Sequence, residues 1–482
     1  MNEKAGLSAW QLTMLALGTV VGGSFFLGSS IAIRTAGPSI FIGFIIGGIM
    51  VYWILSALSE MTVANPQPGS FRTHAEQMYG PYMGFIVGWV YWTGLILAMS
   101  SEATAASLFI KGWFPFLSLP LLSISIVVLV TLVNLLGARM LSHLESGLAA
   151  IKLLAIIGFI IIALVLVLGL LPGKAPVGTG ALTSVAWFPN GLGGLAGSML
   201  IVLFCYAGFE IIGLASSEAR EPHKTVPRAI RLTVISLVIL YLGVIVLLLP
   251  LIATNQLPAN TSPMVAALTA RGLGFAAGIM NVVLVTAIIS TMLASTFGLG
   301  RMLRSLADTG HAPSFLIDRQ DVPLRGILFS GLAMLAAISL SYLLPRQVYL
   351  FLVSSGGFSL LLAYLVIMLT HLRFRDRYGC PPSGHCQMKG FPWTTWTTII
   401  SLILVIATMP LIPGQGAGLM AGLFLLVFYS AAFLIFRTEA FRRIPAPVKP
   451  FFENDQYNPD ANHMTRRQWD KIKKLLGRMS QK

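Results

Sequence analysis

The sequence carries little charge for its length. Of 482 residues, only 10% are Asp, Glu, Lys or Arg, whereas 56% are hydrophobic. Soluble domains carry about 25% charged residues, so the composition excludes an ordinary soluble protein and indicates a polytopic membrane protein. The formal net charge of +15 could suggest nucleic-acid binding, but no basic patch interleaved with aromatic residues occurs in a polar segment. We therefore expect a lipid bilayer as the environment and no nucleic-acid partner.

Cysteine is also scarce. The three cysteines are Cys205, Cys380 and Cys386, too few for a disulfide framework. Cys380 and Cys386 flank the sequence PPSGH, which ends in His385. A metal site there would need a fourth ligand at an unusual spacing. We therefore expect a cytoplasmic loop with reduced thiols, no metal and no cofactor.

Long hydrophobic runs are abundant. A helix that crosses a bilayer needs about 20 mostly apolar residues, and the sequence contains twelve such segments. They lie at 13–34, 39–63, 82–110, 119–137, 146–171, 192–217, 229–252, 272–300, 325–343, 347–371, 394–412 and 416–437. An even number of spans predicts that both termini lie on the same side of the membrane.

Basic residues indicate which side that is. With the N-terminus inside, 26 of the 32 Lys and Arg residues fall on the inner side and five on the outer side. The remaining one, Lys152, lies well inside the fifth span rather than at its end. Because inner loops carry the excess of basic residues, the pattern predicts a multi-pass protein of the plasma membrane with both termini in the cytoplasm.

Two spans contain residues that weaken a helix. The first holds GTVVGGSFFLGSS at 18–30, and the sixth places Gly208 close to Glu210 at its centre. Each stretch alone is also consistent with close helix packing. Interrupted helices in matching positions of two five-helix halves, however, indicate an inverted-repeat transporter with a midplane site. Unwound backbone would offer N–H groups to a carboxylate and carbonyls to an ammonium, the two charged ends of an amino acid.

Few ionisable residues lie within the spans. Glu60 ends the second span, where an interfacial role is favoured, and Glu218 near the end of the sixth suggests a gate or loop ion pair. Glu102 is either a buried carboxyl bonded to neighbouring backbone or a cavity carboxylate that carries a proton. Lys152 either extends to the inner surface or is a buried ammonium that gains and loses a proton. Glu210 marks the break in the sixth span.

Several segments, in order, resemble the amino acid–polyamine–organocation superfamily, and within it the bacterial amino acid permeases. They are GGSFFLGSSIAIRTAGP, LSEMTVANPQPGSF, SSEATAASLFIKGWFP, YAGFEIIGLASSEAREPHKTVPRAI, TAIISTMLASTFGLGRMLRSLADTGHAP and LVSSGGFSLLLAYLVIMLTHLRFR. The resemblance extends over residues 10–440. It implies an all-α, leucine-transporter-type fold of twelve transmembrane helices with spans 1 and 6 discontinuous. The implied parts are a cytoplasmic arm (1–12), two inverted five-helix repeats (13–171 and 192–371), two further helices (394–437) and a basic cytoplasmic tail (438–482).

The resemblance also implies a site. An L-amino acid would bind at the breaks of spans 1 and 6, and its implied contacts are Val21, Gly22, Gly23, Ser24, Glu102, Phe204, Tyr206, Ala207, Gly208, Phe209 and Leu293. Lys152 matches a lysine that some relatives have where sodium-coupled relatives bind an ion. It therefore implies coupling to a proton without sodium, with Glu210 as a second proton-coupling residue and no metal.

This chain departs from the family pattern in its pocket. The first break reads Val21-Gly22-Gly23-Ser24, where relatives commonly have Ile-Gly-Thr/Ser-Gly. A frequent Asn-Ser pair of span 8 is replaced by Leu293-Ala294, and Ala207 replaces a frequent polar residue. A less polar pocket favours a neutral, apolar amino acid, whereas Glu102 argues for a cationic one.

Other functions stay open at this point. A cationic amino acid or polyamine carrier and an exchanger are the main alternatives to a proton symporter. A channel or membrane enzyme is less favoured, since no nucleophile–base pair or catalytic motif occurs in the spans. The protein is expected to be a monomer or homodimer. Its tail contains RRQWDKIKKLLGRM, either a helix on anionic lipid or a solvated segment.

Overall fold

A computed structural model describes residues 7–65, 67, 69–172, 175–210, 212–213, 219–258, 260–318, 322–343, 348–380, 386–412 and 414–437. Within these ranges the chain is helical and holds no strand, only an isolated bridge between Leu7 and Ala219. The expectations for Glu218, for His385 and for the tail from 438 onward fall outside the described residues.

The long helices follow the hydrophobic runs. They are α3 (Ile40–Ala64), α5 (Pro81–Lys111), α6 (Leu119–Asn134), α7 (Ala138–Leu168), α10 (Pro222–Leu251), α12 (Gly274–Asp308), α13 (Leu324–Leu343), α14 (Val348–Tyr378), α15 (Trp393–Thr408) and α16 (Gln415–Arg437). Three shorter apolar helices are α1 (Ala9–Val20), α2 (Ser29–Ala36) and α8 (Gly191–Cys205). Within the described residues, eight helical stretches are long and apolar enough to cross a membrane.

Some helices extend beyond the predicted spans. α10 begins at 222 rather than 229, and α12 ends at 308 rather than 300. An apolar window finds only the part of a helix suited to hydrocarbon, whereas backbone hydrogen bonding continues into the polar ends. The sequence analysis also missed two short helices, α4 (Phe71–Tyr79) and α11 (Pro263–Ala270), because neither is long enough to cross a bilayer.

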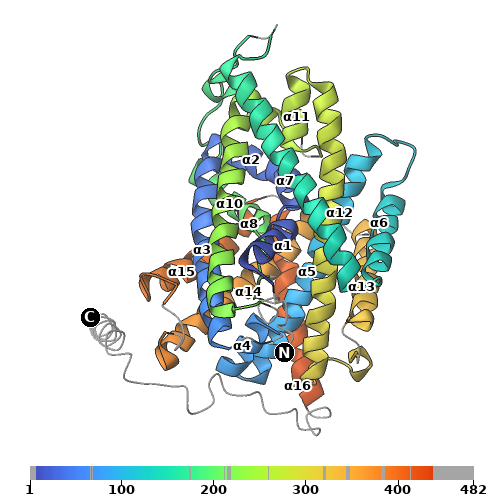
Figure 1. The fold of residues 1–482 in the computed structure, drawn as a ribbon, viewed down its shortest axis with the longest axis vertical. Helices are drawn as coiled ribbons and strands as arrows, with labels where there is room; N and C mark the ends of the chain where they lie inside the picture. Colours follow the sequence, from blue (N-terminus) through green and yellow to red (C-terminus); the bar gives the residue numbers. More distant parts are fainter. Residues whose placement is uncertain are drawn as a thin grey trace.

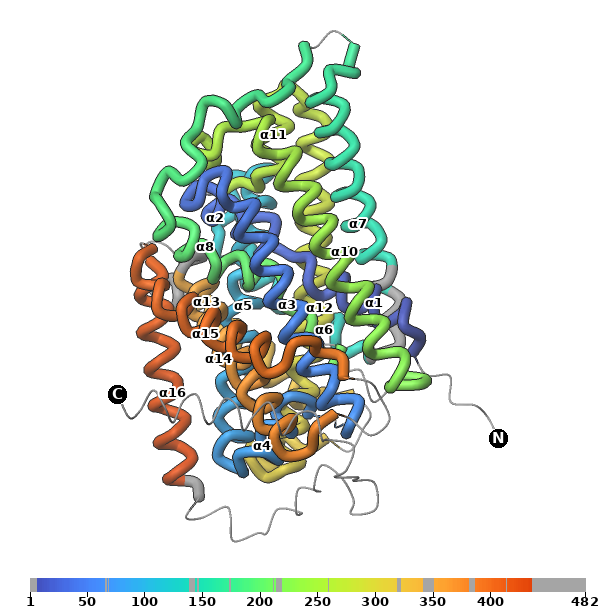
Figure 2. Tube along the Cα trace, turned by 90° about the vertical axis from the view of Figure 1, so that its left-hand side faces the viewer, coloured from blue at the N-terminus to red at the C-terminus, as the bar shows by residue number. Residues whose placement is uncertain are grey.

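The helices form one bundle around α1. In Figure 1, α1 lies near the centre, with α3 and α10 on one side of it and α12 and α5 on the other. α4 lies at one end of the bundle and α11 at the other, while α16 runs along the outside in Figure 2. The helix α5 packs against both α12 and α14. Elements far apart in the sequence therefore meet around α1.

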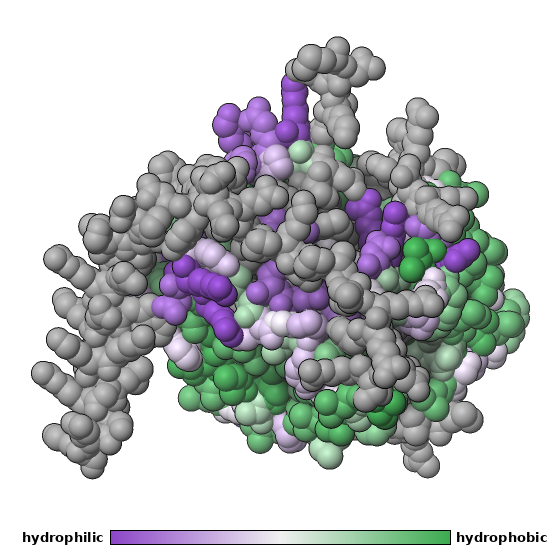
Figure 3. All heavy atoms as spheres, turned by 90° about the horizontal axis from the view of Figure 1, so that it is seen from below, coloured by the Kyte–Doolittle hydropathy of each residue, from purple (hydrophilic) through white to green (hydrophobic). Residues whose placement is uncertain are grey.

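The outer helices expose apolar side chains. Leu154 of α7 is 67% exposed and Val427 of α16 is 69% exposed. Seen from the end that carries α4, hydrophilic residues gather toward the middle and hydrophobic side chains form much of the rim (Figure 3). Exposed leucine and valine on the side of a bundle suit hydrocarbon rather than water, in keeping with a membrane protein.

Candidate functional site

The chain leaves α1 in the middle of the bundle. α1 ends at Val20, and Val21 has extended backbone angles (φ −77°, ψ 96°). After Gly22 the chain turns into a π-helical segment, Ser24–Gly28, which leads into α2. We call residues 21–24 the first break. Glycine suits such a segment because it fits close to neighbouring elements: a Cβ on Gly22 would lie 2.9 Å from the Thr291 hydroxyl oxygen.

A second interruption follows α8. This helix ends at Cys205, and residues 206–210 form a turn in which Gly208 has φ +107°. We call residues 205–210 the second break. Glu210 closes it, since its Oε2 accepts a hydrogen bond from the Gly208 N–H at 2.7 Å. The Cys205 thiol donates to the Ser24 carbonyl at 3.1 Å, so the two breaks lie in direct contact.

The backbone amides of the first break bind a carboxylate. Glu102 of α5 is buried, and its Oε2 accepts from the Gly23 N–H at 2.5 Å while its Oε1 accepts from the Ser24 N–H at 2.9 Å. Two backbone donors directed at one carboxylate are a common arrangement for binding an anion. Glu102 is therefore a buried carboxyl bonded to backbone, as one interpretation predicted, and its role as a proton carrier stays a prediction.

The carbonyls of the first break face an ammonium group. Lys152 of α7 is fully buried, which excludes extension to the surface. Its Nζ donates to the carbonyl of Gly18, to that of Val21 at 3.2 Å and to the Thr291 hydroxyl at 3.4 Å. Thr291 of α12 itself donates to the Val21 carbonyl at 3.0 Å. Thus α7 and α12 together hold the end of α1.

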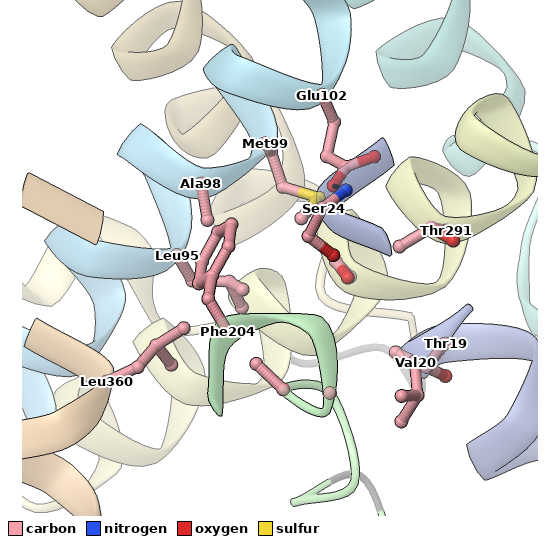
Figure 4. A pocket seen from close by; sticks show the side chains of 13 residues that line it. Thr19, Val20, Ser24, Leu95, Ala98, Met99, Glu102, Phe204, Thr291 and Leu360 are labelled. Atoms are coloured by element: carbon pink, nitrogen blue, oxygen red, sulfur yellow. Dashed lines mark hydrogen bonds between the residues drawn. The ribbon is translucent and has the colours of Figure 1, made fainter. Parts of the chain in front are cut away.

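A small pocket lies where these elements meet (Figure 4). The cavity has a volume of about 20 Å³ for the centre of a water molecule, so it holds about one water. In Figure 4, Glu102 and Ser24 lie close together at one end, and Phe204 lies beside Leu95 and Ala98. The lining residues are Thr19, Val20, Ser24, Leu95, Ala98, Met99, Glu102, Phe204, Ala207, Gly208, Thr291, Ser295 and Leu360. One wall is thus apolar and the opposite one polar.

The structure brings part of the predicted site to this pocket. The predicted residues that line it are Ser24, Glu102, Phe204, Ala207 and Gly208. Val21 and Gly23 contribute backbone groups bound by Lys152 and Glu102, and Gly22 lies between them. These residues form one continuous arrangement around the two breaks.

Three further predicted contacts, Tyr206, Phe209 and Leu293, neither line the pocket nor contribute backbone groups to the first break. The Tyr206 hydroxyl donates to the Phe44 carbonyl at 3.0 Å, so its side chain is turned toward α3. Phe209 stacks on Tyr364 of α14, with ring centroids 5.0 Å apart. Leu293 is buried in α12 but is not among the lining residues. The predicted direct contacts of these three side chains with substrate therefore have no support in this arrangement.

Two tyrosines that the sequence analysis missed hold the second break. The Tyr364 hydroxyl donates to Glu210 Oε1 at 2.9 Å. The Tyr241 hydroxyl of α10 donates to the Cys205 carbonyl at 2.9 Å, and its ring stacks on Phe25 at 4.0 Å between centroids. A tyrosine inside an apolar span is weak evidence for a functional residue, because only the fold shows which carbonyl or carboxylate its hydroxyl binds.

A second buried cluster lies at the far end of α3 and α14, and it surrounds Glu60. This residue is fully buried within the protein. Its carboxylate accepts from His371 Nε2 at 2.7 Å, from Arg375 Nε at 2.7 Å and from the N–H groups of Gln387 and Met388. Glu60 therefore has its partners inside the protein, and its position at the inner membrane interface stays a prediction.

The cysteine prediction also needs correction. Cys380 and Cys386 are joined as a disulfide rather than held as separate thiols. Within the described residues no group of three or more His, Cys, Asp or Glu residues is arranged to hold a metal ion.

Comparison with known proteins identifies the class. Residues 11–448 match the family model described as amino acid permease. The chain is 31% identical to the gamma-aminobutyric acid permease of Bacillus subtilis (strain 168), over 90% of this chain and 94% of that protein. It is 33% identical to the gamma-aminobutyric acid permease of Escherichia coli (strain K12), over 85% of this chain and 89% of that protein.

A solved structure shares the fold. A manganese transporter from Eremococcus coleocola, crystallised as a point mutant, superposes with a TM-score of 0.57 and 15% identity. The match covers 90% of this chain and 94% of the transporter. At this identity the likeness concerns the fold alone.

Proposed function

Because the chain belongs to the amino acid permease family, we propose that it is a secondary active transporter that imports a neutral L-amino acid across the bacterial plasma membrane, coupled to a proton. The family consists of transporters and not of enzymes, and the chain is a multi-pass membrane protein. Direction, coupling ion and substrate are the proposed parts.

The proposed membrane topology has twelve crossings. In it, α1, the first break and α2 form one discontinuous span, and α8 with the second break belongs to another. Residues 13–171 and 192–371 would be the two inverted repeats, followed by two helices within 394–437, with both termini in the cytoplasm. The sequence positions of the two interruptions and their contact through Cys205 and Ser24 support this assignment.

The observation that carries the substrate assignment is the carboxylate at the first break. The amides of Gly23 and Ser24 already bind the carboxylate of Glu102. In the proposed mechanism, the substrate's carboxylate replaces that of Glu102 on these amides. The binding geometry for an amino acid carboxylate would thus be present before substrate arrives, and protonation of Glu102 would release it.

The pocket favours a neutral substrate over a cationic one. Two backbone N–H groups already bind the carboxylate of Glu102, so this carboxylate is not available to pair with a cationic substrate. The other side of the pocket is lined by Leu95, Phe204 and Leu360, and a buried cationic side chain there would have no partner. The relatives named as gamma-aminobutyric acid permeases also support a substrate without net charge.

Lys152 is the proposed coupling residue. While its ammonium binds the carbonyls of Gly18 and Val21, it holds α1 against α7 and α12. Loss of the proton would weaken these charge-assisted hydrogen bonds and allow α1 to move. Glu210 would act similarly at the second break, where Tyr364 and the Gly208 amide bind its carboxylate. The bundle of spans 1, 2, 6 and 7 would then rock against the other helices to expose the site to each side in turn.

A ligand screen tests the substrate assignment. The purified protein is mixed with each common amino acid, with gamma-aminobutyric acid and with a polyamine at two pH values, and its thermal unfolding is followed. A neutral amino acid should raise the unfolding temperature, since a ligand that binds only the folded state stabilises it. A cationic amino acid or polyamine as the strongest ligand would overturn the pocket argument.

The variant Glu102→Gln separates the two substrate classes. It preserves shape but removes the negative charge. If the substrate's carboxylate displaces Glu102, binding of a neutral amino acid should persist in the variant and depend less on pH. If instead Glu102 pairs with a cationic substrate, the variant should no longer bind that substrate, because the substitution removes the carboxylate that pairs with it.

A further inference from the structure

The sulfur atoms of Cys380 and Cys386 contact a guanidinium group. Arg375 of α14 directs its Nη1 at both sulfur atoms, 2.7 Å from Cys380 Sγ and 2.9 Å from Cys386 Sγ. The two Cα atoms are 5.3 Å apart, within the range that a disulfide spans without backbone movement. Cys386 is exposed and Cys380 is partly exposed, so a small molecule in solution can reach them.

The same arginine holds the cluster around Glu60. Arg375 Nη2 donates to Glu60 Oε1 at 3.0 Å, and the ring of Phe391 lies 5.1 Å from its Cζ atom. The two residues that directly follow Cys386 donate their backbone N–H groups to that same oxygen, Gln387 at 2.6 Å and Met388 at 2.7 Å. Cys386 thus directly precedes two of the donors that bind Glu60, so a covalent bond at its sulfur restrains the chain next to them.

The surroundings suit reversible thiol chemistry. A neighbouring cation stabilises a thiolate, and the thiolate is the form that attacks a disulfide. The proposed orientation puts this end of α14 in the cytoplasm, where disulfides are transient rather than structural. The disulfide of the structure is then the oxidised state of the pair, which reduction in the cytoplasm converts to a dithiol.

We propose that Cys380 and Cys386 form a site of reversible thiol–disulfide exchange, whose oxidation fixes residues 387–388 on Glu60 and so tightens the junction of α3 with α14. The oxidant is a small-molecule disulfide. One cysteine thiolate attacks it, forms a mixed disulfide and releases one thiolate of the oxidant. The second cysteine thiolate then attacks the mixed disulfide and releases the other. The protein loses two electrons, the oxidant gains them, and the two protons of the cysteine thiols pass to solvent or to the released thiolates.

Hydrogen exchange on the full-length protein tests this proposal. The reduced protein is incubated with oxidised glutathione, the free thiols are counted by alkylation and mass spectrometry, and amide exchange of the peptide containing Gln387 and Met388 is measured. We expect the Cys380 and Cys386 thiols to disappear together, to return on reduction, and the exchange of these amides to slow severalfold in the oxidised state. The buried Cys205 serves as the internal reference and should stay reduced.

The variants Cys380→Ser and Cys386→Ser are the matched controls. Each leaves one thiol, which can form a mixed disulfide but not the internal one, so exchange at residues 387–388 should not slow. Two results would overturn the proposal: both thiols remain free after oxidised glutathione, or the internal disulfide forms and exchange matches that of Cys380→Ser. Neither readout depends on transport, so a failure of the proposed function would be recognised separately.

Discussion

Replacing Lys152 by Met tests the coupling mechanism. The substitution keeps an apolar stem of similar length and removes only the ammonium, which donates to the carbonyls of Gly18 and Val21. Thr291 has one hydroxyl proton and already donates it to the Val21 carbonyl. The Gly18 carbonyl would therefore lose its charged donor with no equivalent replacement.

The expected magnitude follows from those two hydrogen bonds. A hydrogen bond to a charged group contributes about 1.5–3 kcal/mol. Losing two of them would weaken the attachment of α1 to α7 and α12 by roughly 3 kcal/mol or more, which is about a hundredfold in the equilibrium between the attached and released positions of α1. Such a change would stop proton binding from controlling which position α1 adopts.

The assay compares two transport modes in proteoliposomes. In Lys152→Met, uptake driven by an inward proton gradient should stop at equilibration, whereas exchange of labelled for unlabelled substrate should continue. The continuing exchange shows that the variant is folded and binds substrate. Accumulation at the level of the unaltered protein would refute the coupling role of Lys152.

The remaining predictions concern the second break and the α4 end of the bundle. Gly208→Ala puts a Cβ on a residue with φ +107°, which costs about 1–2 kcal/mol and should weaken substrate binding about tenfold in a titration. The control is Gly278→Ala, because nothing lies within 4 Å of a Cβ at that position, and this variant should bind substrate normally. Equal affinities of the two variants would contradict the requirement for glycine at position 208. Tyr241→Phe leaves the buried Cys205 carbonyl without its hydroxyl donor, a cost of about 1–3 kcal/mol, and should raise the KM of uptake while the protein stays folded; an unchanged KM would mean that this hydrogen bond does not position the break. Burial lowers the pKa of His311 to about 4 from its ordinary value of 6.5, so the folded protein holds it neutral. The contribution of neutral His311 to the free energy of unfolding should be complete above about pH 6.5 and decrease as the pH drops toward 4, by at most about 3 kcal/mol. The unfolding temperature of His311→Asn should therefore depend less steeply on pH than that of the unaltered protein.

The helices and the two interruptions were predictable for a simple physical reason. Spans such as 39–63 and 82–110 contain the apolar residues that a bilayer selects, and α3 and α5 occupy nearly the same ranges. Glycine-rich stretches at 18–30 and around Gly208 lie where α1 and α8 end. Both signals are local, so a single sequence carries them.

The partners of the buried charged residues were not predictable in this way. Glu60 meets Arg375 across 315 positions of sequence, and Glu102 meets the Gly23 amide across 79. No local pattern states that two segments will adjoin. The sequence could indicate that Glu102, deep within a span, needed a partner inside the protein, but only the packing of the helices determines which partner each carboxylate has.

The short helix α4 was missed for a related reason. Its sequence, FRTHAEQMY, is polar, yet Arg72 and His74 are fully buried in it. Arg72 donates to Glu76 at 2.9 Å within the helix and to Thr309 beyond α12 at 3.3 Å. Polar residues between two spans indicate a solvated loop unless their partners are known, and here a partner lies more than 200 residues away.

Accumulation under a proton gradient measures whether transport is coupled to protons. The purified protein is reconstituted into proteoliposomes, and uptake of the strongest neutral ligand from the screen is measured with and without an inward proton gradient and with and without sodium. We predict accumulation above the outside concentration that requires the proton gradient and does not depend on sodium. Accumulation that requires sodium and does not depend on pH would contradict proton coupling.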